Sequence, residues 1–107
     1  MLRVRMVRVH ADRVVDFRAW FRELASRRSE VLETFEQEGT RAESVHLVRS
    51  ADGPLLVYVM DVDDPERARR AFQASTLQID VEHKRAMKAC CDGPYEAELL
   101  FECSTSR

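Results

Sequence analysis

The spacing of apolar residues has a period of two at both ends of the chain and a helical period between them. Apolar and basic side chains alternate over residues 2–6, and apolar and acidic side chains alternate over residues 95–103. Strict alternation is typical of a strand that buries one face. The chain is therefore expected to begin and end in β-strands.

Between these strands the pattern predicts a helix, two strands and a helix pair. A long helix is expected from Asp12, its N-cap, to about residue 38, with Gly39 at its C-terminus. The next strands are expected at residues 43–49 and 55–62, around a turn at residues 50–54. A helix should start at Asp63-Asp64-Pro65 and break near Ser75, and another should run to about residue 91, before Asp92-Gly93-Pro94.

This βαββαβ order predicts an α+β fold of the ferredoxin-like type. Such a fold has a four-stranded antiparallel sheet with helices on one face. A chain of 107 residues is long enough for one core and too short for two. We therefore expect a single domain over residues 1–107.

The strand at residues 55–62 predicts a partner. Leu55, Val57 and Val59 alternate with Leu56, Tyr58 and Met60, so both of its faces are apolar and both should be buried. Helices cover only one face of the expected sheet. A homodimer formed through the helix-free face, with Tyr58 and Met60 in it, is one explanation. Partial exposure of these two side chains is the other.

Composition excludes several classes of function. A net charge of −2 with 34% charged residues gives no bias toward nucleic acid. No apolar run reaches the roughly 20 residues of a membrane span, and no signal peptide is visible, so we expect a cytoplasmic protein. The three cysteines lack metal-type spacing and no nucleotide fingerprint is present, so neither a metal nor a cofactor is expected.

Arg28 interrupts an apolar helical stripe. Phe17, Phe21, Leu24, Val31 and Phe35 share one face of the expected long helix, and Arg28 falls in the gap between Leu24 and Val31. A buried guanidinium keeps its charge and needs a partner. Arg28 is therefore expected either to pair with an internal carboxylate such as Asp80 or Glu82, or to bind an anionic substrate group.

His83 interrupts a second stripe. It lies among Ile79, Ala86, Met87 and Cys90, and Asp80 is three residues earlier, within reach of a carboxylate-to-imidazole contact. An imidazole oriented in this way would serve as an acid or base near neutral pH. We therefore predict His83 and Asp80 as catalytic residues; a hydrogen-bonded core histidine is the alternative.

Three further residues are predicted to contribute to substrate binding. Trp20 borders the apolar stripe and would wall a pocket, although core packing also explains it. Tyr58 fits either a pocket or a dimer interface. His10 lies at the first strand-to-helix connection, where loops often carry function.

The chain is similar to a bacterial family of unknown function in several stretches: Arg27-Arg28-Ser29-Glu30-Val31-Leu32-Glu33-Thr34, Glu38-Gly39, Glu43-Ser44, and Ser75 through Ile79-Asp80-Val81-Glu82-His83. As a whole it resembles the dimeric α/β-barrel superfamily, in which two ferredoxin-like subunits join sheet to sheet. That superfamily includes antibiotic-biosynthesis-type monooxygenases, stress-responsive barrel proteins, sugar mutarotases and muconolactone isomerase-like enzymes. The resemblance implies a small-molecule pocket without choosing a chemistry.

Two hypotheses for the function agree with these patterns. In the first, a cytoplasmic homodimer binds a small anionic or carbonyl-bearing molecule between helices and sheet, as an isomerase, a lyase or a cofactor-free oxygenase-like enzyme. In the second, the protein is a non-enzymatic binding or interaction dimer, and Arg28, Asp80 and His83 form a closed structural network. An open cavity beside Arg28 and His83 would favour the first hypothesis.

Overall fold

The computed structural model describes residues 1–95 and 97–105, and the order of its elements follows the predicted one. The strands are β1 (Leu2–Val9), β2 (Thr40–Ser50), β3 (Gly53–Val62) and β4 (Cys91–Tyr95). A 3-10 turn, η1 (Ala11–Arg13), precedes the helices α1 (Val14–Ser26), α2 (Arg28–Glu38), α3 (Pro65–Ala74) and α4 (Gln78–Cys90).

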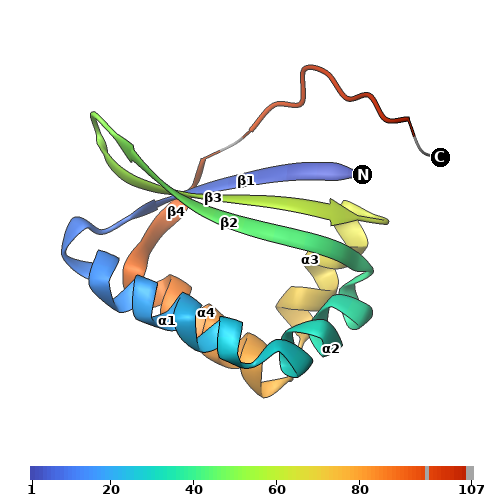
Figure 1. The fold of residues 1–107 in the computed structure, drawn as a ribbon, viewed down its shortest axis with the longest axis horizontal. Helices are drawn as coiled ribbons and strands as arrows, with labels where there is room; N and C mark the ends of the chain where they lie inside the picture. Colours follow the sequence, from blue (N-terminus) through green and yellow to red (C-terminus); the bar gives the residue numbers. More distant parts are fainter. Residues whose placement is uncertain (96, 106–107) are drawn as a thin grey trace.

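The strands form one four-stranded sheet in the order β2-β3-β1-β4, and every hydrogen-bonded pair is antiparallel. The connection from β1 to β2 passes over β3, and the connection from β3 to β4 passes over β1. All four helices lie on the same side of this sheet (Figure 1). The structure is therefore α+β, with a four-stranded antiparallel sheet and a helical layer on one face.

Alternation along the central strands divides side chains between the two faces of the sheet. Val7 and Val9 of β1 and Leu56 and Tyr58 of β3 belong to the buried cluster that packs against the helices. The expectation that Tyr58 and Met60 lie on the helix-free face is wrong, because both contribute to this helix-facing core. The opposite set of β3 side chains, Leu55, Val57 and Val59, points away from the helices.

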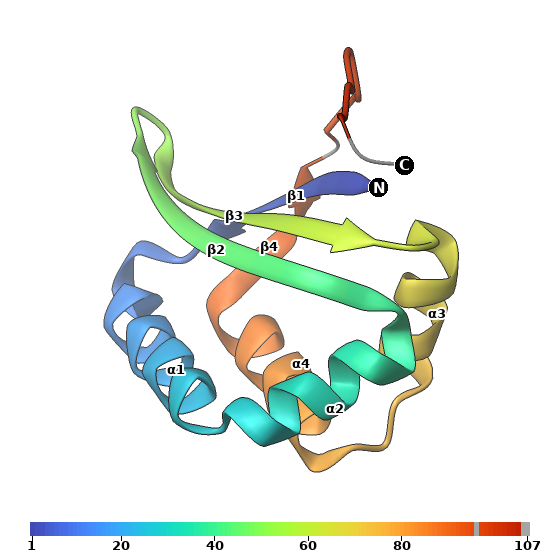
Figure 2. The same ribbon diagram turned by 45° about the vertical axis from the view of Figure 1, so that its right-hand side comes forward.

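The predicted long first helix is two helices. Arg27, with φ −113° and ψ 47°, interrupts the helical path between α1 and α2. The two helices run in different directions in Figure 2. The predicted cap Asp12 is also wrong: it lies in η1, and Arg13 precedes the first residue of α1.

Two of the predicted helix boundaries are confirmed. Gly39 adopts φ 77° and ψ 31° at the end of α2, and its backbone N–H donates to the carbonyl oxygen of Phe35. The Asp64 carboxylate accepts hydrogen bonds from the backbone of Glu66 and Arg67 at the start of α3.

The last strand differs from its predicted position. β4 is Cys91–Tyr95, so Asp92-Gly93-Pro94 lies within a strand and does not separate a helix from one. The predicted alternating strand at residues 95–103 includes Glu96, which lies outside the described residues, and residues 97–103 form no strand. Alternation shows that a segment suits a strand, but a strand also needs a partner. Among the described residues, β1 pairs with β4 over Met6 to Val9.

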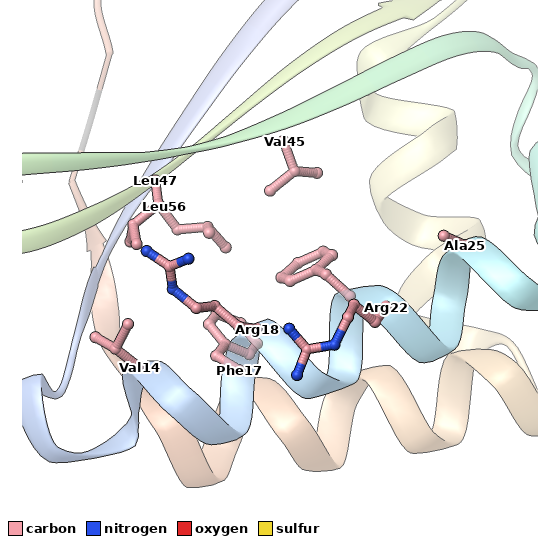
Figure 3. A pocket seen from close by; sticks show the side chains of 9 residues that line it. Val14, Phe17, Arg18, Arg22, Ala25, Val45, Leu47 and Leu56 are labelled. Carbon is pink, nitrogen blue, oxygen red and sulfur yellow. The ribbon is translucent and has the colours of Figure 1, made fainter.

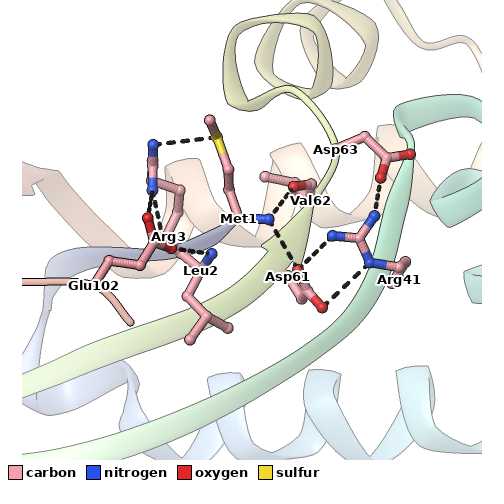
Figure 4. A network of polar contacts seen from close by, with 8 residues as sticks. All are labelled: Met1, Leu2, Arg3, Arg41, Asp61, Val62, Asp63 and Glu102. Atoms are coloured by element: carbon pink, nitrogen blue, oxygen red, sulfur yellow. Dashed lines mark hydrogen bonds and ion pairs between the residues drawn. The ribbon is translucent and has the colours of Figure 1, made fainter. Parts of the chain in front are cut away.

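Charged residues fix the ends of β1 and β3 together (Figure 4). The Met1 nitrogen donates to the Val62 carbonyl at 2.8 Å and to the Asp61 carboxylate at 3.1 Å. Asp61 also pairs with Arg41 of β2 at 2.7 Å, which lowers the pKa of the Asp61 carboxyl. Glu102 accepts from the Leu2 backbone at 2.9 Å, so the C-terminal segment is held on the side of the sheet away from the helices.

Gly39→Ala should destabilise the protein by about 1 kcal/mol, because an L-residue is disfavoured at positive φ. Gly93→Ala is the matched control: its φ is not positive, and no atom lies within 4 Å of an added Cβ. Urea unfolding measures both variants. Equal stability of the two would contradict the left-handed cap at Gly39.

Candidate functional site

A cavity of about 960 Å³ separates part of the sheet from the helices. Its volume lies in the upper range of small-molecule sites. Apolar side chains from all four helices contribute to the wall, among them Phe21, Phe35, Phe72 and Met87. The ionisable side chains in the wall are Arg3, Arg5, Glu38, Glu43, Tyr58, Arg69, Asp80, His83 and Lys84.

The sheet face under the cavity is polar for a reason visible in the strand register. Arg5 lies opposite Tyr58, and Glu43 lies opposite Met60 on the other side of β3. Arg5 is on the same face of β1 as Val7, which is buried under the helices. Charged side chains thus occupy positions that belong to the core elsewhere along the strands.

His83 is placed in the cavity wall as a hydrogen-bonded ring. The indole N–H of Trp20 donates to His83 Nδ1 at 2.7 Å, and Nε2 lies 2.9 Å from the Tyr58 hydroxyl. Because Nδ1 accepts, the proton of the neutral ring is on Nε2 and is donated to Tyr58. The Tyr58 hydroxyl donates in turn to the sulfur of Met87 at 3.2 Å.

Burial keeps this chain of hydrogen bonds neutral. Aromatic rings of Trp20, Phe21, Tyr58 and Phe72 surround the imidazole. Loss of solvation lowers the pKa of His83 to about 4 and raises the pKa of Tyr58 above its ordinary value. Neither group changes its charge near neutral pH, and both ring nitrogens already have protein partners.

Asp80 holds helices together and does not orient His83. Its buried carboxylate accepts a 2.6 Å hydrogen bond from the Thr34 hydroxyl of α2 and another from Ser75, which lies between α3 and α4. Asp80 also lies in the first turn of α4, where the helix dipole favours a negative charge. No hydrogen bond joins Asp80 and His83 in the part of the chain that the structure describes.

Arg28 is exposed and lies outside the cavity wall. The expected stripe assumed one continuous helix, and the break at Arg27 changes the helical phase. Arg27 instead makes the internal contacts: it pairs with Glu82 of α4 at 2.7 Å, and with Glu30. Arg28, Asp80 and His83 therefore do not form the closed network considered from the sequence.

The three residues predicted to contribute to substrate binding differ in their position relative to the cavity. Tyr58 lines the cavity, and Trp20 stands behind His83, in the core next to the wall. His10 lies at the β1–η1 connection, 3.6 Å from Asp92, and is not part of the wall.

Sequence reasoning missed Arg5 and Glu43. The available signal was the phase of the first strand, since Arg3 and Arg5 fall on the same face as Val7 and Val9. Glu43 gave a similar signal, because it alternates with Val45 and Leu47, which pack against the core. Charged residues in phase with core residues indicate either a solvated strand end or a cavity.

A second hollow adjoins the cavity. It lies between α1 and the sheet, measures about 420 Å³, and shares Phe21, Ala25 and Val45 with the cavity wall. Figure 3 shows Arg18 and Arg22 projecting from α1 beside its apolar floor.

The residues with described structure contain no helix that is both long and apolar enough to cross a membrane. Nor do they bring three or more His, Cys, Asp or Glu side chains into a metal-binding group.

These features define a small α+β protein with an open, mostly apolar cavity between its helices and its sheet, lined in part by charged side chains. The chain belongs to the family described as "Family of unknown function (DUF6176)", which it matches over residues 2–106. Comparison of the chain with the curated proteins and with the solved structures found no match.

The His83 ring should remain neutral, with its proton on Nε2, from pH 8 down to about pH 5, because its pKa is about 4. Two-bond ¹⁵N–¹H correlation spectra report both the tautomer and the titration, and His83→Gln assigns the signals. A protonation midpoint near pH 6.5 would show that the ring is solvated and that the chain from Trp20 to Tyr58 is not formed.

Proposed function

We propose that this protein is a homodimer that binds a small amphiphilic anion, a carboxylate or an enolate, in the cavity between its helices and its sheet. The observation that carries the proposal is Arg5. Arg5 lines the cavity with an exposed side chain, and among the described residues it forms no hydrogen bond or ion pair.

An unpaired guanidinium in such a wall favours a negatively charged ligand. Arginine stays protonated, and its planar fork matches a carboxylate with two parallel hydrogen bonds. Two other arginines near the cavity do have carboxylate partners. Arg3 pairs with Glu102 at 3.7 Å, and Arg27 pairs with Glu82. Arg5 replaces Arg28 as the expected anchor, because Arg28 lies outside the cavity.

The remainder of the wall suits the apolar part of such a ligand. The neutral pair of His83 and Tyr58 lies beside Arg5, and aliphatic and aromatic side chains of the helices continue from it. The charge of Arg18 and Arg22 at the adjoining hollow would draw anions toward the cavity. Isomerase, lyase and cofactor-free oxygenase-like reactions remain candidates for the chemistry of the bound ligand.

Octanoate and octanamide are matched probes of the anchor. Octanoate should raise the melting temperature more than octanamide does, because only the carboxylate forms an ion pair with Arg5, whereas the neutral amide oxygen accepts a weaker hydrogen bond. Arg5→Met should weaken octanoate binding about 10- to 100-fold, the loss of a charge-assisted hydrogen bond pair. Arg28→Met is the control and should bind as the wild type does.

Calorimetric titration gives the affinities. Equal binding of the acid and the amide, or an unchanged affinity in Arg5→Met, would contradict an anion site at Arg5.

The helix-free face supports the proposal of a dimer. Leu2, Val4 and Val48 are 54%, 47% and 42% exposed, and Leu55, Val57 and Val59 lie between them on β3. Leu100 and Phe101 of the C-terminal segment, on the same side of the sheet, are 85% and 82% exposed. Contiguous apolar surface of this kind marks interaction sites.

A subunit of the ferredoxin-like, dimeric α/β-barrel type accounts for both the sheet and its bare face. Each helical connection passes over one strand, as in a split β-α-β unit, and leaves all helices on one side. The three free cysteines, Cys90, Cys91 and Cys103, support a reducing compartment such as the cytoplasm.

Val4→Lys should convert the dimer to a monomer, because it buries a charge in the centre of the proposed interface. Val15→Lys is the matched control: Val15 is 76% exposed on α1, away from the sheet. Sedimentation equilibrium at micromolar concentrations distinguishes the two. A wild-type monomer, or a Val4→Lys dimer as stable as the wild type's, would overturn this interface.

A further inference from the structure

We infer that Glu43 is a proton-transfer residue of the cavity, acting on a carbonyl compound whose developing oxyanion is held by Arg5. The inference rests on the proposed function, because it uses the same cavity and the same anchor. It adds a reaction, the enolisation of a carbonyl compound, and a base to perform it.

Glu43 differs from the other carboxylates of the wall in having no partner. Glu38 accepts a hydrogen bond from Thr40 at 3.0 Å, and Asp80 accepts from Thr34 and Ser75. Within the described residues no donor reaches the Glu43 carboxyl group, and the exposed side chain lines the cavity from the core side of β2. Its oxygens are thus available to a ligand.

The surroundings of Glu43 suit proton transfer at neutral pH. The Glu43 side chain is exposed to the open cavity, and the partial loss of solvation beside the cavity wall, reinforced by the negative charge of Glu38, raises the pKa of Glu43 to about 7. A carboxyl group that is half ionised near neutral pH can both accept and return a proton. His83 is less suited, since its pKa is about 4 and both of its nitrogens are engaged.

Other charged or titratable groups reach the same cavity from every neighbouring element. They are Arg3 and Arg5 of β1, Tyr58 of β3, Glu38 of α2, Arg69 of α3, and Asp80, His83 and Lys84 of α4. Of these, Glu38 is the carboxylate that acts on Glu43. Arginine side chains do not change charge near neutral pH, so a rate profile near pH 7 would report the carboxyl group.

The sheet sets a suitable separation between the base and the anchor. Glu43 on β2 and Arg5 on β1 have β3 between them, which places the strands that carry them about 10 Å apart. They are also offset by two residue positions along β3, since Glu43 is opposite Met60 and Arg5 is opposite Tyr58. A ligand bound between them can present an oxygen to Arg5 and a C–H bond to Glu43.

The step is balanced without an oxidant or a reductant. The Glu43 carboxylate takes a proton from the carbon next to the carbonyl, and the electron pair of that C–H bond forms a C=C bond. The carbonyl π pair moves to oxygen, and the enolate oxygen is stabilised by the Arg5 guanidinium. The protonated Glu43 carboxyl group exchanges its proton with solvent and then returns a solvent proton. Return to the same carbon gives hydrogen exchange, and return to a different carbon of a conjugated enolate gives an isomer.

2-Oxohexanoate is a probe that carries a carboxylate, a carbonyl, acidic hydrogens at C3 and an apolar tail. In D₂O, proton NMR should show loss of the C3 signal faster with the wild-type protein than in buffer alone. Glu43→Gln should slow this protein-dependent exchange about 10²- to 10⁴-fold. Glu36→Gln, which changes an exposed carboxyl of α2 outside the cavity, should exchange at the wild-type rate.

The exchange rate should rise with pH through about 7 as Glu43 ionises, and the Glu43→Gln profile should be flat. Folding of this variant is not at risk. Because the pKa of Glu43 is higher in the folded protein than in the unfolded chain, the wild type loses stability as the pH rises above the unfolded-state pKa. Gln cannot ionise, so Glu43→Gln should melt no lower than the wild type at pH 8.

Binding of 2-oxohexanoate, measured by calorimetry, separates the two proposals. Binding by Glu43→Gln without exchange supports the inference. Binding by the wild type without exchange, or exchange that survives in Glu43→Gln and is lost in His83→Gln, overturns the role of Glu43 and leaves the anion site standing. Absence of wild-type binding overturns both.

Discussion

Charged side chains on the core-facing side of the strands are the constraint on which the rest of this structure depends. β1 carries Val7 and Val9 where the helices pack closely, and Arg3 and Arg5 on the same face farther along. An unpaired charge cannot be enclosed in a dry core without a cost of several kcal/mol. The helical layer therefore stays close over the valines and leaves a cavity over the arginines.

The polar groups around the cavity fall into two kinds. Trp20, His83 and Tyr58 satisfy one another in a neutral chain, and Asp80 is satisfied by Thr34 and Ser75. Such groups hold helices to the sheet and to each other. Arg5 and Glu43 have no such partners among the described residues, and these are the groups that a ligand would complete. Whether a polar group already has a partner in the protein, more than its residue type, thus separates the structural residues from the residues that we propose bind the ligand.

The order of elements was predictable because it depends on local periodicity, and the Gly39 and Asp64 caps were predictable because they depend on short motifs. The placement of His83 on the inner face of its helix was also predictable from spacing. Its partners were not: Trp20 is 63 positions away along the chain, and Thr34, which binds Asp80, is 46 positions from it. Spacing along one helix cannot show a hydrogen bond to another element.

The break at Arg27 explains the largest difference between the expected and the observed site. In a continuous helix the stripe of Phe17 and Phe21 would have carried Arg28 inward. With the break, Arg27 turns toward α4 and pairs with Glu82, which lowers the pKa of that carboxyl.

α2 then begins with Arg28 outward, and it presents Val31, Thr34 and Phe35 to the cavity. One backbone distortion thus moves the guanidinium out of the wall and brings in the hydroxyl that holds Asp80. That exchange leaves Arg5, from the sheet, as the cation that faces the cavity without a partner among the described residues.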